Sequence, residues 1–234
     1  MKPQIFGWQH FTYLGIFVVL SVAGLIVAKI FAKDETVQNI ILKSTAIALL
    51  IAIVTNRFSI VFKGANPDWV QLIPDSYCGM SSLVLSMAVL IGKRDNAVLH
   101  FVWFIAILGG CITMVYPDFI GQNESIFYIP TISGLLHHSI AIVLVIMLFL
   151  FNHITVTYKK WYCTVIGFMA YITVGAFLIG AMGKNDAFHI ITPMLSGTPL
   201  HTWVILPIYV VVYGTTLAIF ELVRKKRSHE DIIG

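Results

Sequence analysis

Charged residues are scarce in this chain of 234 residues. Asp, Glu, Lys and Arg make up only 11% of it, hydrophobic residues make up 58%, and the mean hydropathy is +0.88. A soluble domain carries about 25% charged residues, so the chain has too little polar surface to cover a globule in water. The net charge of +4 comes from basic residues scattered between apolar segments. We therefore expect membrane lipids, and no nucleic acid, as partners.

Cysteine is also rare. The three cysteines have no paired spacing, which argues against a disulfide framework and against a zinc signature. His137 and His138 are adjacent, so on a helix they point about 100° apart and cannot easily bind one ion together. We therefore predict neither a metal nor a cofactor.

Long apolar runs fill the remainder of the chain. A helix needs about 20 apolar residues to cross a hydrocarbon core, and the sequence predicts an all-α, polytopic membrane helix bundle of seven transmembrane helices. The third segment is short and polar for a span. We expect residues 1–234 to form a single transmembrane domain. The predicted segments are His10–Ala28, Ile41–Phe62, Cys78–Gly92, Leu99–Tyr116, Thr131–Phe151, Trp161–Met182 and His201–Val223.

The distribution of Lys and Arg predicts the orientation. Basic residues are retained on the cytoplasmic side, and one side of the predicted bundle carries many more of them than the other. The poorer side has Lys2, Lys63 and Lys184, with Arg57 in or near the second segment. We therefore predict a multi-pass protein of the cell membrane with the N-terminus outside and the C-terminus inside. The richer side has Lys29, Lys33, Lys43, Lys93, Arg94, Lys159, Lys160, Arg224, Lys225, Lys226 and Arg227.

Polar residues concentrate toward the outer ends of the predicted helices. Cys78 and Ser82 are four residues apart in the third segment and share a helix face, and His137 lies near the start of the fifth. A thiol and an imidazole are the parts of a nucleophilic site, in which Cys78 attacks an acyl carbonyl and His137 is its base. Arg57 is suited to bind an oxyanion or a lipid phosphate. We predict that substrate is bound by Arg57, His138, Asn185, His189 and Ser82.

Each of these residues also has a purely structural interpretation. A buried cysteine is usually a small hydrophobe, and serines within spans mostly help helices to pack. Arg57 is long enough to snorkel to the membrane surface. The Gly109–Gly110 pair favours close approach of two helices. A histidine in a span, however, is by default functional because its burial is costly, and its alternative role is an interhelical hydrogen bond.

Four segments, in this order, resemble a known family of integral membrane proteins. They are the Cys-containing entry to the third span at 72–78, the Gly-to-Pro-Asp stretch at 109–118, the Leu-His-His motif at 136–138 and the last outer loop at 185–203. In these motifs the chain is similar to the bacterial YwaF-like proteins, which are related to eukaryotic transmembrane protein 164. The resemblance covers most of the chain and agrees with seven spans and an outer N-terminus.

The resemblance implies an activity. The eukaryotic relative is regarded as a cysteine-dependent acyltransferase that acts on phospholipids, which implies that Cys78 is the nucleophile and His137 its base. The chain departs from the family at Ser76, where a histidine is common, and at Gly79, where an acid is common.

We therefore expect a membrane-embedded acyltransferase that passes a fatty acyl group from one phospholipid or acyl-lipid to another. The alternative is a small-solute permease subunit whose vestibule is the outer polar cluster. A permease would require polar residues to continue toward the cytoplasmic side, whereas the inner halves of the predicted spans are mostly Leu, Ile, Val and Phe. A ligand-sensing or assembly protein without catalysis is a third possibility.

Overall fold

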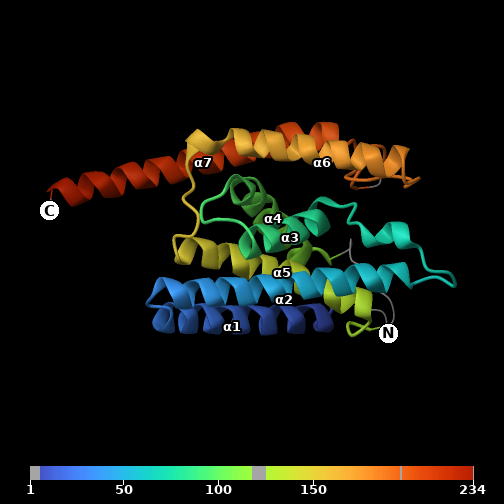
Figure 1. The fold of residues 1–234 in the computed structure, drawn as a ribbon, viewed down its shortest axis with the longest axis horizontal. Coiled ribbons are helices and arrows are strands. Elements are labelled where there is room, and N and C mark those ends of the chain that lie inside the picture. The colour runs from blue at the N-terminus through green and yellow to red at the C-terminus, as the bar shows by residue number, and fades with distance from the viewer. Residues whose placement is uncertain (1–5, 118–124, 196, 234) are drawn as a thin grey trace. The chain divides into compact units, whose positions relative to one another are not determined.

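The computed structural model describes residues 6–117, 125–195 and 197–233, and it describes side chains up to residue 226 (Figure 1). Lys2 and Asp118 lie outside the described residues, as does the side chain of Arg227. The described chain contains α-helices and short 3-10 helices but no strand. The helices are α1 (Trp8–Phe31), α2 (Glu35–Val61), η1 (Trp69–Leu72), α3 (Tyr77–Leu90), α4 (Ala97–Val115), α5 (Ile129–Leu150), η3 (Tyr158–Lys160), α6 (Tyr162–Gly180) and α7 (Thr202–Ile233).

Each of the seven α-helices overlaps one of the predicted apolar segments, although α2 begins before Ile41 and α7 continues past Val223. The all-α prediction is confirmed for the described residues. Six helices are long and apolar enough to cross a membrane; the shorter α3 is the exception. At 1.5 Å per residue, the 14 residues of α3 extend about 21 Å, less than the ~30 Å hydrocarbon core. The count of seven spans and the orientation remain predictions.

Polar side chains begin three of these helices. Asp34, Ser76 and Asn96 precede α2, α3 and α4, and each accepts a hydrogen bond from a backbone amide in the first turn, over 2.9 Å, 3.1 Å and 3.0 Å respectively. Such caps satisfy amide groups that lack a partner within the helix. The cap at Ser76 fixes where α3 begins and therefore places Cys78 in its first turn.

The chain forms two compact units, Met1–Ile154 and Thr155–Gly234, and each is described by itself. The prediction of a single transmembrane domain remains a prediction. In the first unit, α5 is the most buried of the long helices and packs against α2 and α4. The core between these helices is filled by fully buried aliphatic side chains, among them Leu42, Leu49, Leu85, Leu99, Leu144 and Leu148.

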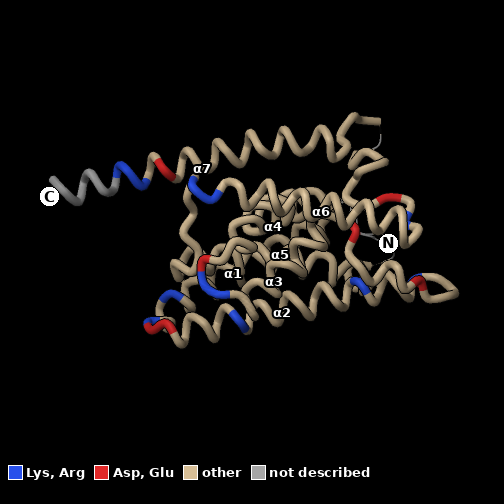
Figure 2. Tube along the Cα trace, turned by 45° about the horizontal axis from the view of Figure 1, so that its top comes forward, with Lys and Arg blue, Asp and Glu red and all other residues tan. Residues whose placement is uncertain are grey.

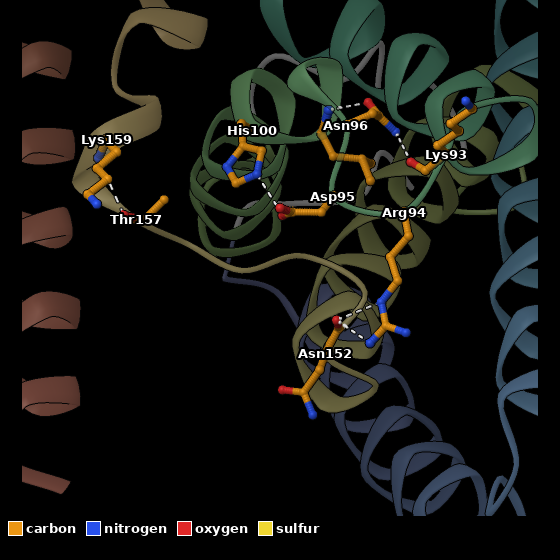
Figure 3. Close-up of polar contacts among 9 residues, drawn as sticks. Lys93, Arg94, Asp95, Asn96, His100, Asn152, Thr157 and Lys159 are labelled. Atoms are coloured by element: carbon orange, nitrogen blue, oxygen red, sulfur yellow. Dashed lines mark hydrogen bonds and ion pairs between the residues drawn. The ribbon is translucent and has the colours of Figure 1, made fainter. Parts of the chain in front are cut away.

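Arg94 connects three turns at one end of the first unit. Its guanidinium lies 3.1 Å from the Glu35 carboxylate at the start of α2, and it donates over 2.8 Å and 3.1 Å to the carbonyl oxygen of Asn152 after α5. Figure 3 shows this contact beside the 2.7 Å pairing of His100 with Asp95. The turn between α3 and α4 therefore lies beside the start of α2. Figure 2 shows basic residues at this end of the unit.

Candidate functional site

Cys78 occupies a narrow space between α3 and α4. Its side chain is partly exposed and forms a hydrogen bond with the Thr113 hydroxyl. A methyl group added to Gly109 would lie 2.6 Å from the Cys78 sulfur, a distance well inside van der Waals contact. The absence of a side chain at Gly109 therefore creates the space in which the thiol lies.

The neighbouring Gly110 serves a different contact. A methyl group there would lie 2.7 Å from a side-chain carbon of Ile142 and 3.2 Å from the carbonyl oxygen of His138, both on α5. The two glycines thus allow α4 to approach α3 on one side and α5 on the other. This bears out the interpretation of the pair as a site of close helix approach, and it adds a role for Gly109 beside the thiol.

His137 is buried on α5, and its Nδ1 atom is 3.0 Å from the hydroxyl oxygen of Ser82 on α3. Both side chains are almost fully buried. Among the described residues no hydrogen bond joins His137 to Cys78, which lies one turn before Ser82 on the same face of α3. Ser82, predicted as a substrate contact, is therefore the partner of the predicted base and lies one helical turn from the predicted nucleophile.

His138 lies beside His137. The two ring centroids are 4.2 Å apart with an angle of 33° between the ring planes, and both rings are buried. Within the described part of the chain, no three His, Cys, Asp or Glu side chains come together in a group suited to hold a metal ion.

Arg57 and Asn56 connect the end of α2 to the segment before α3 and to α5. Arg57 pairs with Asp75 over 3.6 Å and donates to the Asn56 side-chain oxygen over 3.1 Å. Asn56 in turn donates to the Ser133 hydroxyl over 3.2 Å and to the Pro130 carbonyl over 3.0 Å. The Arg57 side chain is only 12% exposed, and in the described structure its buried Nε atom has no hydrogen-bond partner. It therefore lies mostly within the protein and does not extend to the surface as a snorkelling side chain would.

Asn185 and His189 belong to the loop between α6 and α7 in the second unit, and Asn185 is exposed. Asp186 organises this loop by accepting hydrogen bonds from the Thr192 hydroxyl and from three backbone amides. Burial alone raises the pKa of Asp186, but these hydrogen bonds outweigh it and hold the pKa below its ordinary value. The convergence of this loop with Cys78 remains a prediction.

Two residues other than glycine have positive backbone φ angles in the same loop. Phe188 has φ 53° and His189 has φ 56°, a conformation that is uncommon for residues other than glycine. The conformation is held by α7, because the Thr202 hydroxyl donates to the Phe188 carbonyl and the Thr202 amide donates to the His189 carbonyl over 2.9 Å. His189 is thus fixed by its backbone at the start of α7.

Sequence reasoning missed Thr113 as the partner of the thiol and Asp75 as the partner of Arg57. Thr113 follows Gly109 by four residues, so the two share the helix face that meets Cys78. That spacing was a usable signal once Gly109 was interpreted as a contact position. The pairing of Asp75 with Arg57 had no comparable signal, because it depends on how the segment after η1 folds back.

Comparisons with known proteins agree with the motifs. The profile of the TMEM164 family matches residues 5–223. No curated protein and no solved structure gives a match. The match covers nearly the whole chain, including all six of the long apolar helices except the last residues of α7. The chain is therefore a multi-pass integral membrane protein, and it belongs to the TMEM164 family.

Proposed function

We propose that this protein is an acyltransferase of the cell membrane that moves a fatty acyl group between phospholipids through a thioester on Cys78. The observation that carries the proposal is the position of the Cys78 thiol, which lies in the space left by Gly109 and one helical turn from the Ser82–His137 pair. Family membership supports the membrane setting, and the reaction rests on the chemistry of these side chains.

A thiol among apolar neighbours needs a base before it can attack. His137 is the candidate base, and the Ser82 hydroxyl is the candidate proton relay, because it is hydrogen-bonded to the ring and lies one helical turn from Cys78. The thiol proton would pass to Ser82 while the Ser82 proton passes to the imidazole. This arrangement makes Ser82 a positioning and relay residue between the two groups.

The proposed reaction balances without a further reactant. The Cys78 sulfur attacks the ester carbonyl of the donor lipid, the sulfur–carbon bond forms and the ester carbon–oxygen bond breaks. The leaving alkoxide takes the proton held by His137 and departs as a lysolipid. The hydroxyl of an acceptor lysolipid then attacks the thioester, gives its proton to His137 and receives the acyl group, and the proton returns to the sulfur.

Arg57 is the candidate partner of the lipid phosphate. Its guanidinium is mostly buried, its contact with Asp75 is loose at 3.6 Å, and its Nε donor has no partner in the described structure. A phosphate oxygen would satisfy this donor, because a guanidinium presents several N–H groups in a planar fork. His138, Asn185 and His189 remain predicted substrate contacts within the proposal.

The proposed topology has seven spans with the N-terminus outside. Helix α2 begins at Glu35, and Arg94, which follows α3, pairs with that same residue. The segment from the end of α2 to the end of α3 therefore returns to the end of the unit at which α2 begins. Lys and Arg at that end support a cytoplasmic location. Under this topology Cys78 faces the outer leaflet.

Trapping of the thioester tests the proposal directly. Purified protein in vesicles would receive phosphatidylcholine with a labelled acyl chain and lysophosphatidylethanolamine as acceptor. We expect hydroxylamine-sensitive label on Cys78 and transfer to the acceptor, both lost in Cys78→Ser. In His137→Ala both should fall by about 100-fold or more, within the range for loss of a general base. The control is Cys111→Ser, because Cys111 is an exposed thiol on α4. Full transfer by Cys78→Ser would contradict the mechanism.

The permease alternative is disfavoured by the core of the first unit. Beyond the Ser82–His137 pair, the buried positions include Leu85 on α3 and Leu144 on α5, and Leu49 is buried on the neighbouring α2. A solute path would require polar groups there. Uptake of a solute by liposomes that contain the Cys78→Ser protein would favour the permease over the enzyme.

A further inference from the structure

A side-opening cavity of about 490 Å³ lies between α1, α2 and α5, entirely within the first unit. Figure 1 shows α1 running alongside α2. No residue of the candidate catalytic pair lines this cavity. Its lining residues are Tyr13, Ile16, Phe17, Leu20, Ser21, Gly24, Ser44, Thr45, Ala48, Leu136, Ser139, Ile140 and Val143.

Most of the surface that lines the cavity is apolar, and none of its described residues is charged. The polar groups in the lining are the hydroxyls of Tyr13, Ser21, Ser44, Thr45 and Ser139. The cavity is continuous with the outward face of α1, where Ile16 and Leu20 are 55% and 66% exposed. In an integral membrane protein this face contacts lipid. We propose that the cavity binds one acyl chain of a membrane glycerophospholipid, which enters sideways from the bilayer.

The length of the cavity suits one acyl chain. Along α1 the lining runs from Tyr13 to Gly24, which at 1.5 Å per residue is about 16 Å. One leaflet contributes half of the ~30 Å hydrocarbon core, or about 15 Å. A single chain of one leaflet therefore fits along the helix, whereas a globular solute does not match this elongated, apolar shape.

The end of the cavity at Tyr13 has groups that suit the ester region of a lipid. At one end the Tyr13 hydroxyl is 2.8 Å from the Ser139 hydroxyl, and these groups suit the ester region of a lipid. Trp8, which is exposed, precedes Tyr13 by five residues, or about 8 Å along α1, where an aromatic residue marks the membrane interface. With no cation in the lining, the site favours an esterified chain over a fatty acid carboxylate.

This site is separate from the candidate catalytic site. Ser139 lines the cavity, while His137, two residues earlier on α5, bonds to Ser82 on α3. Two residues correspond to a rotation of about 200° around a helix, so the two side chains leave α5 on opposite sides. The bound chain is therefore distinct from the acyl group placed at Cys78, and the proposal does not depend on catalysis.

Photolabelling with a matched pair of glycine variants tests the proposal. A β-carbon added at Gly24 meets no atom within 4 Å, and the same holds for Gly15. The two glycines are nine residues apart, or about two and a half turns, so Gly15 lies on the opposite face of α1 and does not line the cavity. Gly24→Phe should fill the cavity without displacing backbone, and Gly15→Phe adds the same ring elsewhere.

The probe is phosphatidylcholine with a diazirine at the middle of one chain, diluted in unlabelled phosphatidylcholine vesicles that contain the full chain. We expect the label on peptides of α1, α2 and α5 that line the cavity, reduced at least five-fold in Gly24→Phe and unchanged in Gly15→Phe. Ala48→Phe, an exposed lining position on α2, provides a second filling variant if Gly24→Phe does not purify as a folded protein. Equal labelling of filled and unfilled proteins, or crosslinking of the cavity to a second copy of the chain, would overturn the proposal.

Discussion

Replacement of Gly109 by alanine tests whether the space around the Cys78 sulfur is as tight as the structure indicates. The new methyl carbon would lie 2.6 Å from the sulfur, 0.8 Å short of the 3.4 Å at which ordinary contact begins. Overpacking of this kind costs about 1–3 kcal/mol, whereas alanine gains about 1 kcal/mol over glycine in helix propensity. The cost of the clash should therefore match or exceed the gain in helix propensity. Gly109→Ala should lower the free energy of unfolding by about 0–2 kcal/mol.

A double-mutant cycle separates these two effects. In the background of Cys78→Ala no sulfur remains to clash, so Gly109→Ala should become stabilising by about 1 kcal/mol. Thermal unfolding in detergent measures both steps, and 1 kcal/mol corresponds to about 2–4 °C for a chain of this size. Gly24→Ala, in open space, controls for propensity alone. An identical effect of Gly109→Ala with and without the sulfur would refute the reasoning.

The same substitution has a consequence for the proposed reaction. The sulfur has to move by nearly 1 Å to escape the methyl group, and a displacement of about 1 Å can cost 100-fold in rate. We expect thioester formation by Gly109→Ala to fall by about that factor, while Gly24→Ala transfers acyl groups at the wild-type rate. Undiminished thioester formation would show that the thiol does not react from this position.

Two further predictions concern polar contacts. Ser82→Ala leaves the buried Nδ1 of His137 without its partner. It should lower the free energy of unfolding by about 1 kcal/mol, the scale of interhelical hydrogen bonds in membranes. Ser86→Ala, whose hydroxyl bonds within its own helix, should not alter acyl transfer. Asp186 has a pKa below its ordinary 3.8 in the folded loop, so its contribution to stability is complete above pH 3.8 and is lost as the pH falls through the lowered value. Asp186→Asn should abolish this acid-dependent loss, as measured by proteolysis of the loop against pH.

The helices could be predicted from the sequence because their length is set by the membrane. Each long apolar run corresponds to a helix, and most helix ends fall within about three residues of the predicted ones, as for Thr131–Phe151 and α5. The exceptions are the start of α2 at Glu35 and the end of α7 at Ile233, where the helix continues into polar sequence beyond the apolar run. The start of α3 was equally readable, since Ser76 is a good N-cap. The family resemblance, read from ordered motifs such as 72–78 and 136–138, is confirmed by the match over residues 5–223.

The contacts within the candidate site could not be predicted in the same way. Periodicity places Cys78 and Ser82 on one face of α3, but the rotation of α3 against α5 decides which of them meets His137. That rotation depends on how closely α3 and α5 pack against the two glycines of α4. The sequence of α3 alone therefore does not predict it. The same is true of Arg57, whose burial follows from contacts with residues outside its own helix.

The lipid cavity has a physical origin in how α1 is attached. Only 6% of the residues in the apolar part of α1 are buried, against 67% in α5. Two polar contacts hold its first turns, from His10 to the Met114 carbonyl over 2.8 Å and from Tyr13 to Ser139 over 2.8 Å. Leu14 and Phe17 still pack against the core of the first unit, but between Tyr13 and Gly24 the cavity lies beside α1. An unfilled gap there would forfeit dispersion contacts on its walls. A lipid chain that occupies the gap restores them, so removal of lipid by harsh detergent should loosen α1 before it disturbs the packing of α5 against α2.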